Sequence, residues 1–267
     1  MKQNLWKELG RMTLVSLGIF ATLFVVLYIV EYFVPSLKGV LLQWHSKAFC
    51  VGIPASITGT AYVLTIRNPK NYTGFYLGVV MAALLSVQFY YQGNLDLVVL
   101  YAGLFIPFQI ASLVNWRKKC LHPETVKEGG NGPAFISWPL FLLTLAVSAL
   151  LMAGDYALGT LVLYKDGWGD QVVFKLLSGG MIVTAVMANF WMIFQKNDAW
   201  LAWVLYSLVG IAFYILVNNL FSLILFVVFL FVNGQAQFVW LRQTDADKFG
   251  WAGSEKYINR LRKRLGR

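Results

Sequence analysis

The feature that most constrains the fold of this chain is a series of eight apolar stretches, each long enough to cross a bilayer as a helix. The hydrocarbon core of a bilayer is about 30 Å thick, which roughly 20 residues of α-helix span. The stretches cover, approximately, residues 12–34, 47–66, 72–92, 95–115, 134–154, 172–194, 199–217 and 220–241. Only 13% of the 267 residues are charged, about half the share found in soluble domains. The sequence therefore predicts an all-α polytopic membrane protein with eight transmembrane helices.

The first stretch is predicted to be a permanent helix, and the second is the least regular of the eight. Residues 12–34 are too long for the core of a signal peptide, and no small-residue cleavage site follows them. Residues 47–66 include Gly52, Pro54 and Gly59, which dilute their apolar character.

The distribution of basic residues predicts the orientation of the helices. If the amino terminus is cytoplasmic and the spans alternate, 18 of the 22 lysine and arginine residues fall in cytoplasmic segments. The four that fall outside are Lys38, Lys47, Lys165 and Lys175. Enrichment of basic residues on the cytoplasmic side is the usual bias of membrane proteins. We therefore expect both termini in the cytoplasm.

This orientation accounts for the net charge of +10, so no nucleic-acid partner is expected. The end of the chain, residues 254–267, is predicted either to lie as a short amphipathic helix on anionic membrane lipids or to fray as a basic tail. Two cysteines are too few for a disulfide framework. Because Cys50 is predicted near the outer side and Cys120 in the cytoplasm, we do not expect them to pair.

Two segments of the sequence resemble each other. Residues 95–119 and 220–243 each run from a leucine through an apolar span to a tryptophan, which an amide side chain precedes by seven residues. The amide and the tryptophan are Gln109 and Trp116 in the first segment, and Asn233 and Trp240 in the second. The similarity predicts that a three-helix unit occurs twice.

The predicted units are residues 47–116 and 172–241, joined by a linker helix at 134–154. Residues 1–36 add a cytoplasmic segment and one more helix in front, and the basic tail follows as residues 242–267. One intervening helix gives both three-helix units the same orientation. Parallel repeats of this kind occur in transporters, with the substrate site at the interface between the repeats near the middle of the membrane.

The interiors of the predicted spans contain no charged residue or histidine near their middle. Glu31 lies near the outer edge of the first span and Asp96 starts the fourth, while His45 and His122 lie outside the apolar cores. Proton coupling usually needs a buried titrating group, so the sequence favours passive movement of a substrate. An intramembrane enzyme or metal site needs clustered carboxylates, histidines or cysteines. We therefore expect no catalytic residue, no metal and no cofactor.

Polar residues inside membrane spans are candidates for function because their burial is costly. Four amides lie within the spans: Gln88, Gln109, Asn189 and Asn233. An amide supplies both hydrogen-bond donors and acceptors, which suits hydroxyl and carboxamide groups. Hydrogen bonding between helices is the alternative role for each amide.

Aromatic rings are the second group of candidates. Three tryptophans cluster where the sixth span ends and the seventh begins: Trp191, Trp200 and Trp203. An indole ring can stack on a ligand or attract a cation to its face. The alternative for Trp116, Trp200 and Trp240 is packing or a place in the aromatic belt at the membrane surface. Amides and aromatics without charge favour a neutral or delocalised-cation ligand with a ring and several hydroxyls, such as a nucleoside or a vitamin.

Several short motifs resemble those of the PnuC family of bacterial nicotinamide riboside transporters. The motifs are Asp198-Ala-Trp-Leu-Ala-Trp203, Asn115-Trp116-Arg-Lys-Lys119, Phe231-Val-Asn-Gly234 followed by Trp240-Leu-Arg242, and Asn71-Tyr72 before a glycine-containing helix. The resemblance covers residues 47–243. It implies a SWEET-like 3+1+3 fold in the bacterial inner membrane, facilitated diffusion of the riboside, and trapping by cytoplasmic phosphorylation. A homo-oligomer, specifically a trimer, is a further expectation from the family.

The resemblance also implies a set of substrate-binding residues. They are Gln88, Gln109, Asn189, Trp200, Trp203, Ser207 and Asn233. The sequence departs from the family at two of the relevant positions, because Ser207 and Met81 stand where asparagine is common or expected. The alternatives are therefore a transporter of the same fold for thiamine, riboflavin or another small neutral or cationic aromatic metabolite, and a membrane scaffold or sensor that transports nothing.

Overall fold

The computed structural model describes residues 2–34, 36, 39, 42, 45–121, 136–158, 172–216 and 220–243, and the regular structure in these residues is helical. The elements are α1 (Lys2–Phe33), α2 (Lys47–Ile66), α3 (Gly74–Tyr91), α4 (Leu95–Val98), the π-helix η2 (Val99–Phe105), α5 (Ile106–Leu121), α6 (Trp138–Leu158), α7 (Val172–Ile193), α8 (Asp198–Leu216) and α9 (Leu220–Gln243). The elements α4, η2 and α5 follow one another without a break and make one long helical segment.

The described residues thus form the predicted number of long helical segments. Seven of them are long and apolar enough to cross a membrane, and Trp138–Gly154 in α6 is a shorter apolar helix. The fold is that of an all-α polytopic membrane protein, as the sequence predicts. The largest deviation from the predicted bounds is at α1, which starts near residue 2 rather than residue 12.

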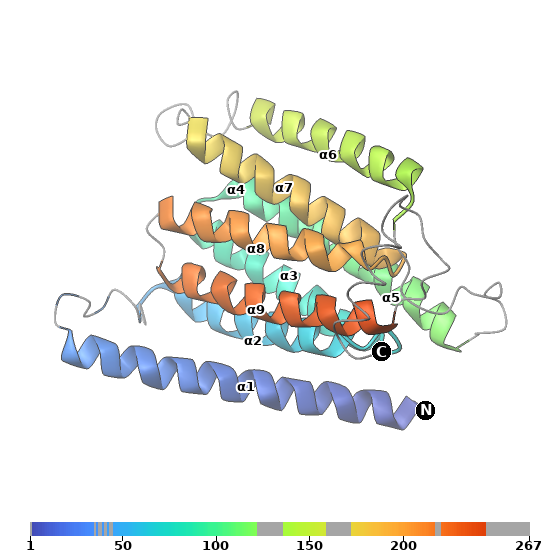
Figure 1. The fold of residues 1–267 in the computed structure, drawn as a ribbon. Coiled ribbons are helices and arrows are strands. Elements are labelled where there is room, and N and C mark those ends of the chain that lie inside the picture. Colours follow the sequence, from blue (N-terminus) through green and yellow to red (C-terminus); the bar gives the residue numbers. More distant parts are fainter. Residues whose placement is uncertain are drawn as a thin grey trace.

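The helices form a central group with one helix on each flank (Figure 1). In the first half of the chain, α3 packs between α2 and the α4–η2–α5 segment. In the second half, α8 packs between α7 and α9. The halves meet where α5 contacts α7 and where α2 contacts α9. The predicted unit boundaries agree with this arrangement in outline and stay a prediction.

The flanking helices α1 and α6 occupy similar places in the two halves. Helix α1 packs on α2, and α6 packs on α7, so each flanking helix covers the first helix of a three-helix group. Figure 1 shows them on opposite sides of the molecule. The sequence predicts residues 1–36 as an addition in front of the repeat. In the structure, α1 packs on the first helix of its half in the same way as α6 packs on the first helix of the other half.

Helix α2 is continuous in spite of its glycines and proline, and it has the largest buried share of the seven spans. At Gly59, a Cβ atom would lie 2.8 Å from the Met81 sulfur and 3.1 Å from the Phe229 ring. Glycine therefore lets α2 approach both α3 and α9. Glycine in this span suits its position, because neighbouring helices enclose α2 and approach it closely.

The third helical segment of the first half contains a π-helical turn, and a proline explains it. The amide N–H of Ile106 donates to the carbonyl of Tyr101, five residues earlier rather than four. The next residue, Pro107, has no N–H, and its ring would clash with the carbonyl four residues before it in an α-helix. The wider turn relieves this conflict by accommodating one extra residue.

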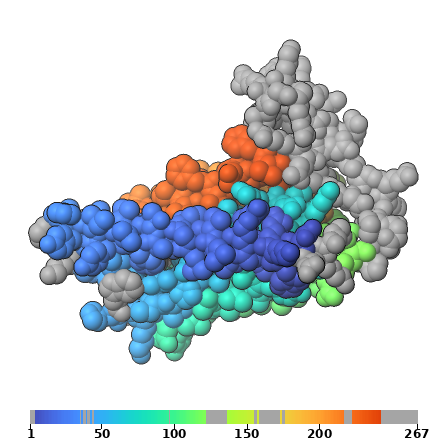
Figure 2. Space-filling model, turned by 90° about the horizontal axis from the view of Figure 1, so that it is seen from below, coloured from blue at the N-terminus to red at the C-terminus, as the bar shows by residue number. Residues whose placement is uncertain are grey.

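The outer faces of the flanking helices are apolar and exposed. Figure 2 shows α1 lying along one face of the molecule over its whole length. Leu14 on α1 is 70% exposed and Leu150 on α6 is 74% exposed, as expected for surfaces that face lipid. The sequence allowed Trp116, Trp200 and Trp240 either to pack inside the protein or to lie in an aromatic belt at the membrane surface. All three are fully buried inside the bundle.

One end of the bundle, called the basic end below, carries Arg67, Lys118, Lys119 and Lys196. It also holds the start of α1 and the end of α9, so both described ends of the chain lie on the same side. Cys120 is at this end, in contact with the Lys70 carbonyl. Cys50, near the start of α2, is at the opposite end, which agrees with the prediction that the two thiols are far apart.

Packing of α8 on α9 predicts a strong effect at Gly210. A Cβ atom there would lie 2.1 Å from two carbons of the Phe226 ring. We expect Gly210→Ala to destabilise the protein by about 1–3 kcal/mol, the usual cost of overpacking, and to lower its thermal unfolding midpoint in detergent. Gly234→Ala in α9 is the matched control, because nothing lies within 4 Å of its Cβ position. Equal midpoints for the two variants would contradict the packing described here.

Candidate functional site

Two of the predicted site residues join the halves of the molecule in its interior. The Gln109 Nε2 on α5 donates to the Asn189 Oδ1 on α7 over 3.0 Å, and both side chains are buried. Asn189 Nδ2 in turn donates to the Ala185 carbonyl at 2.9 Å. The Gln109 Oε1 is buried and has no hydrogen-bond partner among the described residues. The pair thus holds the halves together and leaves one acceptor unused.

Three further predicted residues form a second polar cluster, between α8 and α9. Ser207 Oγ donates to the Trp203 carbonyl at 2.8 Å. Asn233 Nδ2 donates to Ser207 Oγ at 3.1 Å and approaches the Trp203 carbonyl at 3.4 Å. The Asn233 Oδ1, like the Gln109 Oε1, is buried and lacks a partner within the part of the chain that the structure describes. Gln109 and Asn233 thus each use the amide nitrogen within the protein, and the amide oxygen of each has no partner among the described residues.

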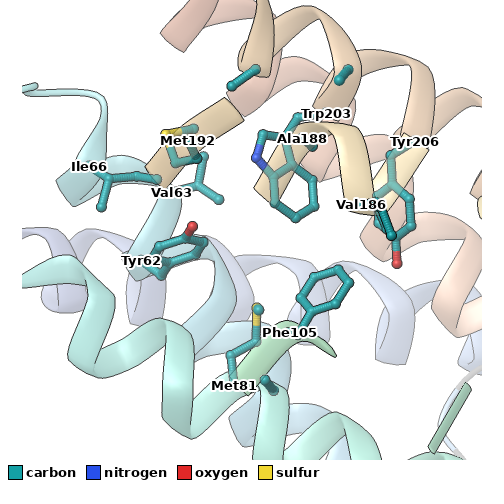
Figure 3. Close-up of a cluster of buried hydrophobic side chains, with 14 of the residues drawn as sticks. Tyr62, Val63, Ile66, Met81, Phe105, Val186, Ala188, Met192, Trp203 and Tyr206 are labelled. Atoms are coloured by element: carbon teal, nitrogen blue, oxygen red, sulfur yellow. The ribbon is translucent and has the colours of Figure 1, made fainter. Parts of the chain in front are cut away.

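Aromatic side chains from different helices lie beside these amides. The Trp203 ring packs edge-on against Phe105 and Tyr206, with centroid distances of 5.8 and 5.4 Å. Figure 3 shows Trp203, Phe105, Tyr62 and Met81 facing one common region from α8, η2, α2 and α3. The Tyr62 hydroxyl is buried beside the Gln109 side chain. This region therefore combines an indole face with unpaired polar atoms.

Gly78 on α3 makes room for the first of these amides. A Cβ atom at Gly78 would lie 2.5 Å from Gln109 Oε1 and 3.1 Å from the Tyr62 ring. Gly78 stands three residues after Phe75, as Trp203 stands three residues after Trp200. Both Phe75 and Trp200 pack edge-on against the tryptophan that ends the third helix of their half. The two halves thus place a glycine and a tryptophan at corresponding positions.

Tyr62, Gly78 and Phe105 are not among the residues predicted from the sequence. Tyr62 is a polar phenol within an apolar span, four residues before the end of α2, and the criterion that selected the amides would also have selected it. Gly78 and Phe105 carry no comparable signal, since glycine and phenylalanine are common in membrane helices. Only the contacts between helices reveal them.

Two predicted residues lie apart from this region. Gln88 is ten residues beyond Gly78 on α3, about 15 Å along the helix, and its amide borders Gly52 on α2. Trp200 is nearer the basic end and packs edge-on against Trp240 at a centroid distance of 5.5 Å. Its indole Nε1 is buried without a partner among the described residues. If Phe75 corresponds to Trp200, the residue that matches Ser207 is Ala82 rather than the expected Met81, and neither side chain supplies a hydrogen-bond donor such as the Ser207 hydroxyl.

The basic end is closed by two reciprocal hydrogen bonds. Trp116 in the first half donates its indole N–H to the Met192 carbonyl of the second half at 2.8 Å. Trp240 in the second half donates to the Arg67 carbonyl of the first half, also at 2.8 Å. The two indole rings meet with a centroid distance of 5.6 Å. Each half therefore contributes one donor and one acceptor to the closure.

Toward the opposite end, the hydroxyls of Tyr101 and Tyr206 are hydrogen-bonded across the same interface. Tyr101 lies eight residues before Gln109, so this contact is about 12 Å from the amide along the helix. The amides and Trp203 lie between the tyrosine contact and the tryptophan contacts. Contacts between the halves therefore occur on both sides of the candidate residues along the bundle.

The side chains of this region are chemically suited to an uncharged group or a delocalised cation. Among the described residues there is no group of three histidine, cysteine or carboxylate side chains that could hold a metal ion. The available polar atoms named above are amide oxygens and a phenol hydroxyl, which accept hydrogen bonds from hydroxyl or amide groups. The indole face adds attraction for a flat or cationic ring.

Known proteins resemble this chain in sequence family and in fold. Residues 50–242 match the family described as "Nicotinamide mononucleotide transporter". The chain is similar to the solved structure titled "Crystal structure of the Vitamin B3 transporter PnuC", with a TM-score of 0.58 and 17% sequence identity. That match covers 89% of this chain and 95% of the other. A comparison with curated protein sequences gave no significant match.

The family match covers well over half of the chain and includes both three-helix groups. It takes in the two amide clusters and the reciprocal tryptophans, and it leaves α1 outside. The similarity to the solved structure establishes the fold. The chain is a multi-pass membrane protein that belongs to the nicotinamide mononucleotide transporter family, a family of transporters rather than enzymes.

Proposed function

We propose that this protein carries nicotinamide riboside into the cytoplasm by facilitated diffusion, with phosphorylation inside the cell preventing its return. The observation that carries the proposal is the pair of buried amide oxygens of Gln109 and Asn233, which have no partner among the described residues. Asn233 contacts the backbone of Trp203, which supplies the indole ring. The riboside has a flat cationic ring, a carboxamide and several hydroxyls. The ring matches the indole face, and the hydroxyl and carboxamide donors match the two oxygens.

The family's description names the mononucleotide, but the charge of the two molecules favours the riboside as the cargo of this protein. The mononucleotide carries a phosphate, and an anion taken out of water needs compensating cations or several donors. The groups described around the two clusters are amides, hydroxyls, thioether and aromatic rings, and their unpaired atoms are mainly acceptors. Acceptors repel a phosphate but attract the partial positive charge of a pyridinium ring.

Uniport is favoured over proton coupling by the same set of groups. Coupling needs a side chain that gains and loses a proton near neutral pH, typically a carboxylate or an imidazole. The residues that carry the proposed site are Gln109, Asn189, Trp203, Ser207 and Asn233. None of these five side chains titrates near pH 7, so movement of the riboside down its concentration gradient is the mechanism that they support.

Two of the proposed site residues lie at the edge of the site rather than at its centre. Trp200 precedes Trp203 by nearly a helical turn and takes part through its contact with Trp240. Gln88 lies toward the opposite end, where its unpaired Oε1 would meet a substrate before or after the central site. Both termini in the cytoplasm, a bacterial inner membrane and a trimeric assembly complete the proposal and rest on charge distribution and family resemblance.

The main alternative is a transporter of the same fold for another small aromatic metabolite. Thiamine is also a cationic aromatic with a hydroxyl, so the indole and amide groups suit it as well. Riboflavin is larger and carries more acceptors. A scaffold or sensor without transport activity has no need for amides buried between its halves, and the unpaired oxygens therefore disfavour it.

Ligand binding to the purified protein separates these cargoes. We expect isothermal titration calorimetry to give saturable heat with nicotinamide riboside, whose ring and donors match the site, and none with nicotinamide mononucleotide, whose phosphate the acceptors repel. Thiamine and riboflavin, titrated alongside, distinguish the riboside from the other aromatic cargoes. Counterflow of the riboside in liposomes without a proton gradient tests the mechanism in the same preparation. Saturable heat with thiamine alone would reassign the cargo and keep the fold.

Removal of the indole or of the bridging amide should abolish transport without unfolding the protein. We expect Trp203→Ala and Gln109→Ala each to lower riboside uptake by about tenfold or more, as each removes at least one strong ligand contact. Trp138→Ala is the matched control, because that tryptophan is 50% exposed on α6 and far from the amides. Uptake that survives in both site variants would remove these residues from the site.

A substitution at Gly78 tests the site without changing any group that contacts the ligand. The added methyl group of Gly78→Ala would collide with the end of the Gln109 side chain, which can move. We therefore expect the Gln109–Asn189 hydrogen bond to break and uptake to fall, while the unfolding midpoint changes little. The double variant Gly78→Ala/Gln109→Ala should transport no worse than Gln109→Ala alone. Additive losses would show that Gly78 acts by another route.

A further inference from the structure

We propose that Glu8 on α1 is a positioning residue that holds the basic end of the transporter in its closed arrangement. Helix α1 lies outside residues 50–242, the part of the chain that matches the family. This role rests on the proposed function in one respect: opening and closing of the basic end are taken to be steps of transport. It is carried by a chain of hydrogen bonds from α1 to the contacts between the halves.

The first link is the turn between α2 and α3, residues 67–71, called the inner turn below. Three of its backbone carbonyls accept hydrogen bonds from side chains of other elements. The pairs are Trp240 Nε1 to the Arg67 carbonyl at 2.8 Å, Gln195 Nε2 to the Pro69 carbonyl at 3.1 Å, and Cys120 Sγ to the Lys70 carbonyl at 3.3 Å. Two of the donors belong to the second half. The closure of the basic end therefore depends on the direction in which the inner turn points its carbonyls.

Two asparagines fix the shape of the inner turn. Asn68 Oδ1 accepts from the Lys70 N–H at 3.2 Å. Asn71 Oδ1 accepts from the Thr73 N–H at 3.1 Å and from the Thr73 hydroxyl at 2.6 Å. Such bonds from an asparagine oxygen to the backbone two residues later define a local turn. Each asparagine can make them only if its oxygen, not its nitrogen, faces the backbone.

Glu8 determines which way both asparagine amides face. Its Oε2 accepts from Asn68 Nδ2 at 3.1 Å and from Asn71 Nδ2 at 3.0 Å. The Asn71 nitrogen also approaches the Leu5 carbonyl of α1 at 3.4 Å. A carboxylate only accepts hydrogen bonds, so it draws the amide nitrogens toward α1 and leaves the oxygens toward the turn. One side chain of α1 thus orients both asparagines.

The partner of the inner turn in the second half is a strained residue. Gln195, between α7 and α8, has a φ of 55°, which is uncommon for a residue with a side chain. It is 2% exposed, and its Oε1 accepts from Lys119 Nζ at 3.3 Å while its Nε2 donates to Pro69. A strained conformation persists only where neighbours hold it. The inner turn is one of the neighbours that hold Gln195.

The second half has a corresponding tie to its own flanking helix. Asp198, at the start of α8, accepts from the Ile136 N–H just before α6 at 2.7 Å. In both halves, a carboxylate therefore joins the turn after the first helix to the flanking helix, through Glu8 on α1 and through Asp198 toward α6. The repetition of this contact on opposite flanks indicates that the flanking helices brace the two turns that meet at the basic end.

Opening of the basic end has to break the bonds from Trp240 and Gln195 to the inner turn, while Glu8 stays with its own half. Without the carboxylate, the amide groups of Asn68 and Asn71 are no longer held in one orientation. Because their oxygens fix the shape of the inner turn, the carbonyls of the turn then no longer point in a fixed direction. The closing bonds then weaken, and the basic end opens more often. Cys120 reports this opening directly, because its thiol is half-buried against the inner turn.

The test measures the rate at which a membrane-permeant maleimide modifies Cys120, by mass spectrometry of the intact protein, in a Cys50→Ser background. We expect Glu8→Ala to raise this rate by about tenfold, the ratio that corresponds to the loss of one charged hydrogen bond. Glu31→Ala is the matched control at the other end of α1, where the carboxylate accepts from the Leu42 N–H at 2.7 Å. It should leave the rate unchanged.

A double variant separates positioning from a general loss of stability. If Glu8 acts through the inner turn on Gln195, Glu8→Ala/Gln195→Ala should label Cys120 no faster than the faster single variant. If Glu8→Ala does not fold, Glu8→Asp, with the same charge on a shorter side chain, should give a smaller rise. A labelling rate within about twofold of the parent in every folded Glu8 variant, or additive effects with Gln195→Ala, would overturn the proposal.

Labelling requires no substrate, so it is independent of the cargo. Faster labelling in a protein that does not bind the riboside would leave the role of Glu8 intact and reject the proposed cargo. Normal riboside transport together with unchanged labelling would reject the role of Glu8 and keep the proposed function.

Discussion

The relative placement of the two halves depends on the hydrogen bonds that Trp116 and Trp240 donate to one another's half. The last carbonyls of a helix have no partner within the helix, and lipid cannot supply one. Met192 is in the last turn of α7, and Arg67 directly follows α2, so each indole satisfies such a carbonyl. An indole N–H would be costly to bury without an acceptor. Here it donates to an otherwise unpaired carbonyl at the end of a helix in the opposite half. The amide bridge and the Trp203 cluster follow from the geometry that these two bonds set.

Much of this arrangement could be predicted because lipid makes polarity informative. In a chain with so few charged residues, an amide within an apolar span stands out, and Gln109, Asn189 and Asn233 are all buried at or near the interface between the halves. The number of helices follows from the spacing of the apolar stretches. The equal distance between amide and tryptophan in two segments predicted the repeat, and the reciprocal contacts of Trp116 and Trp240 agree with it.

Other features depend on contacts between residues far apart in the sequence and could not be predicted. Gln88 has the same chemistry as Gln109 but faces Gly52 near the opposite end, because helix length separates it from the other amides. The buried Trp200 and Trp240 occupy positions along their helices that are equally typical of a surface belt. Asn71 reads in the sequence as an ordinary turn residue, and its contact with Glu8 spans more than 60 residues of chain.

The π-helical turn before Pro107 divides one helical segment into two parts. The part after the turn matches the corresponding helix of the other half, and the part before it is rotated relative to an unbroken α-helix. From Gln109 to Trp116, the spacing matches that from Asn233 to Trp240, so the two halves correspond residue by residue. One extra residue in the turn rotates everything before it by about 100° relative to an unbroken α-helix. Tyr101 and Phe105 reach the interior as a result, and Val99 is left 55% exposed. Chain length in this segment, rather than residue type, decides which side chains face the interior of the bundle and which face lipid.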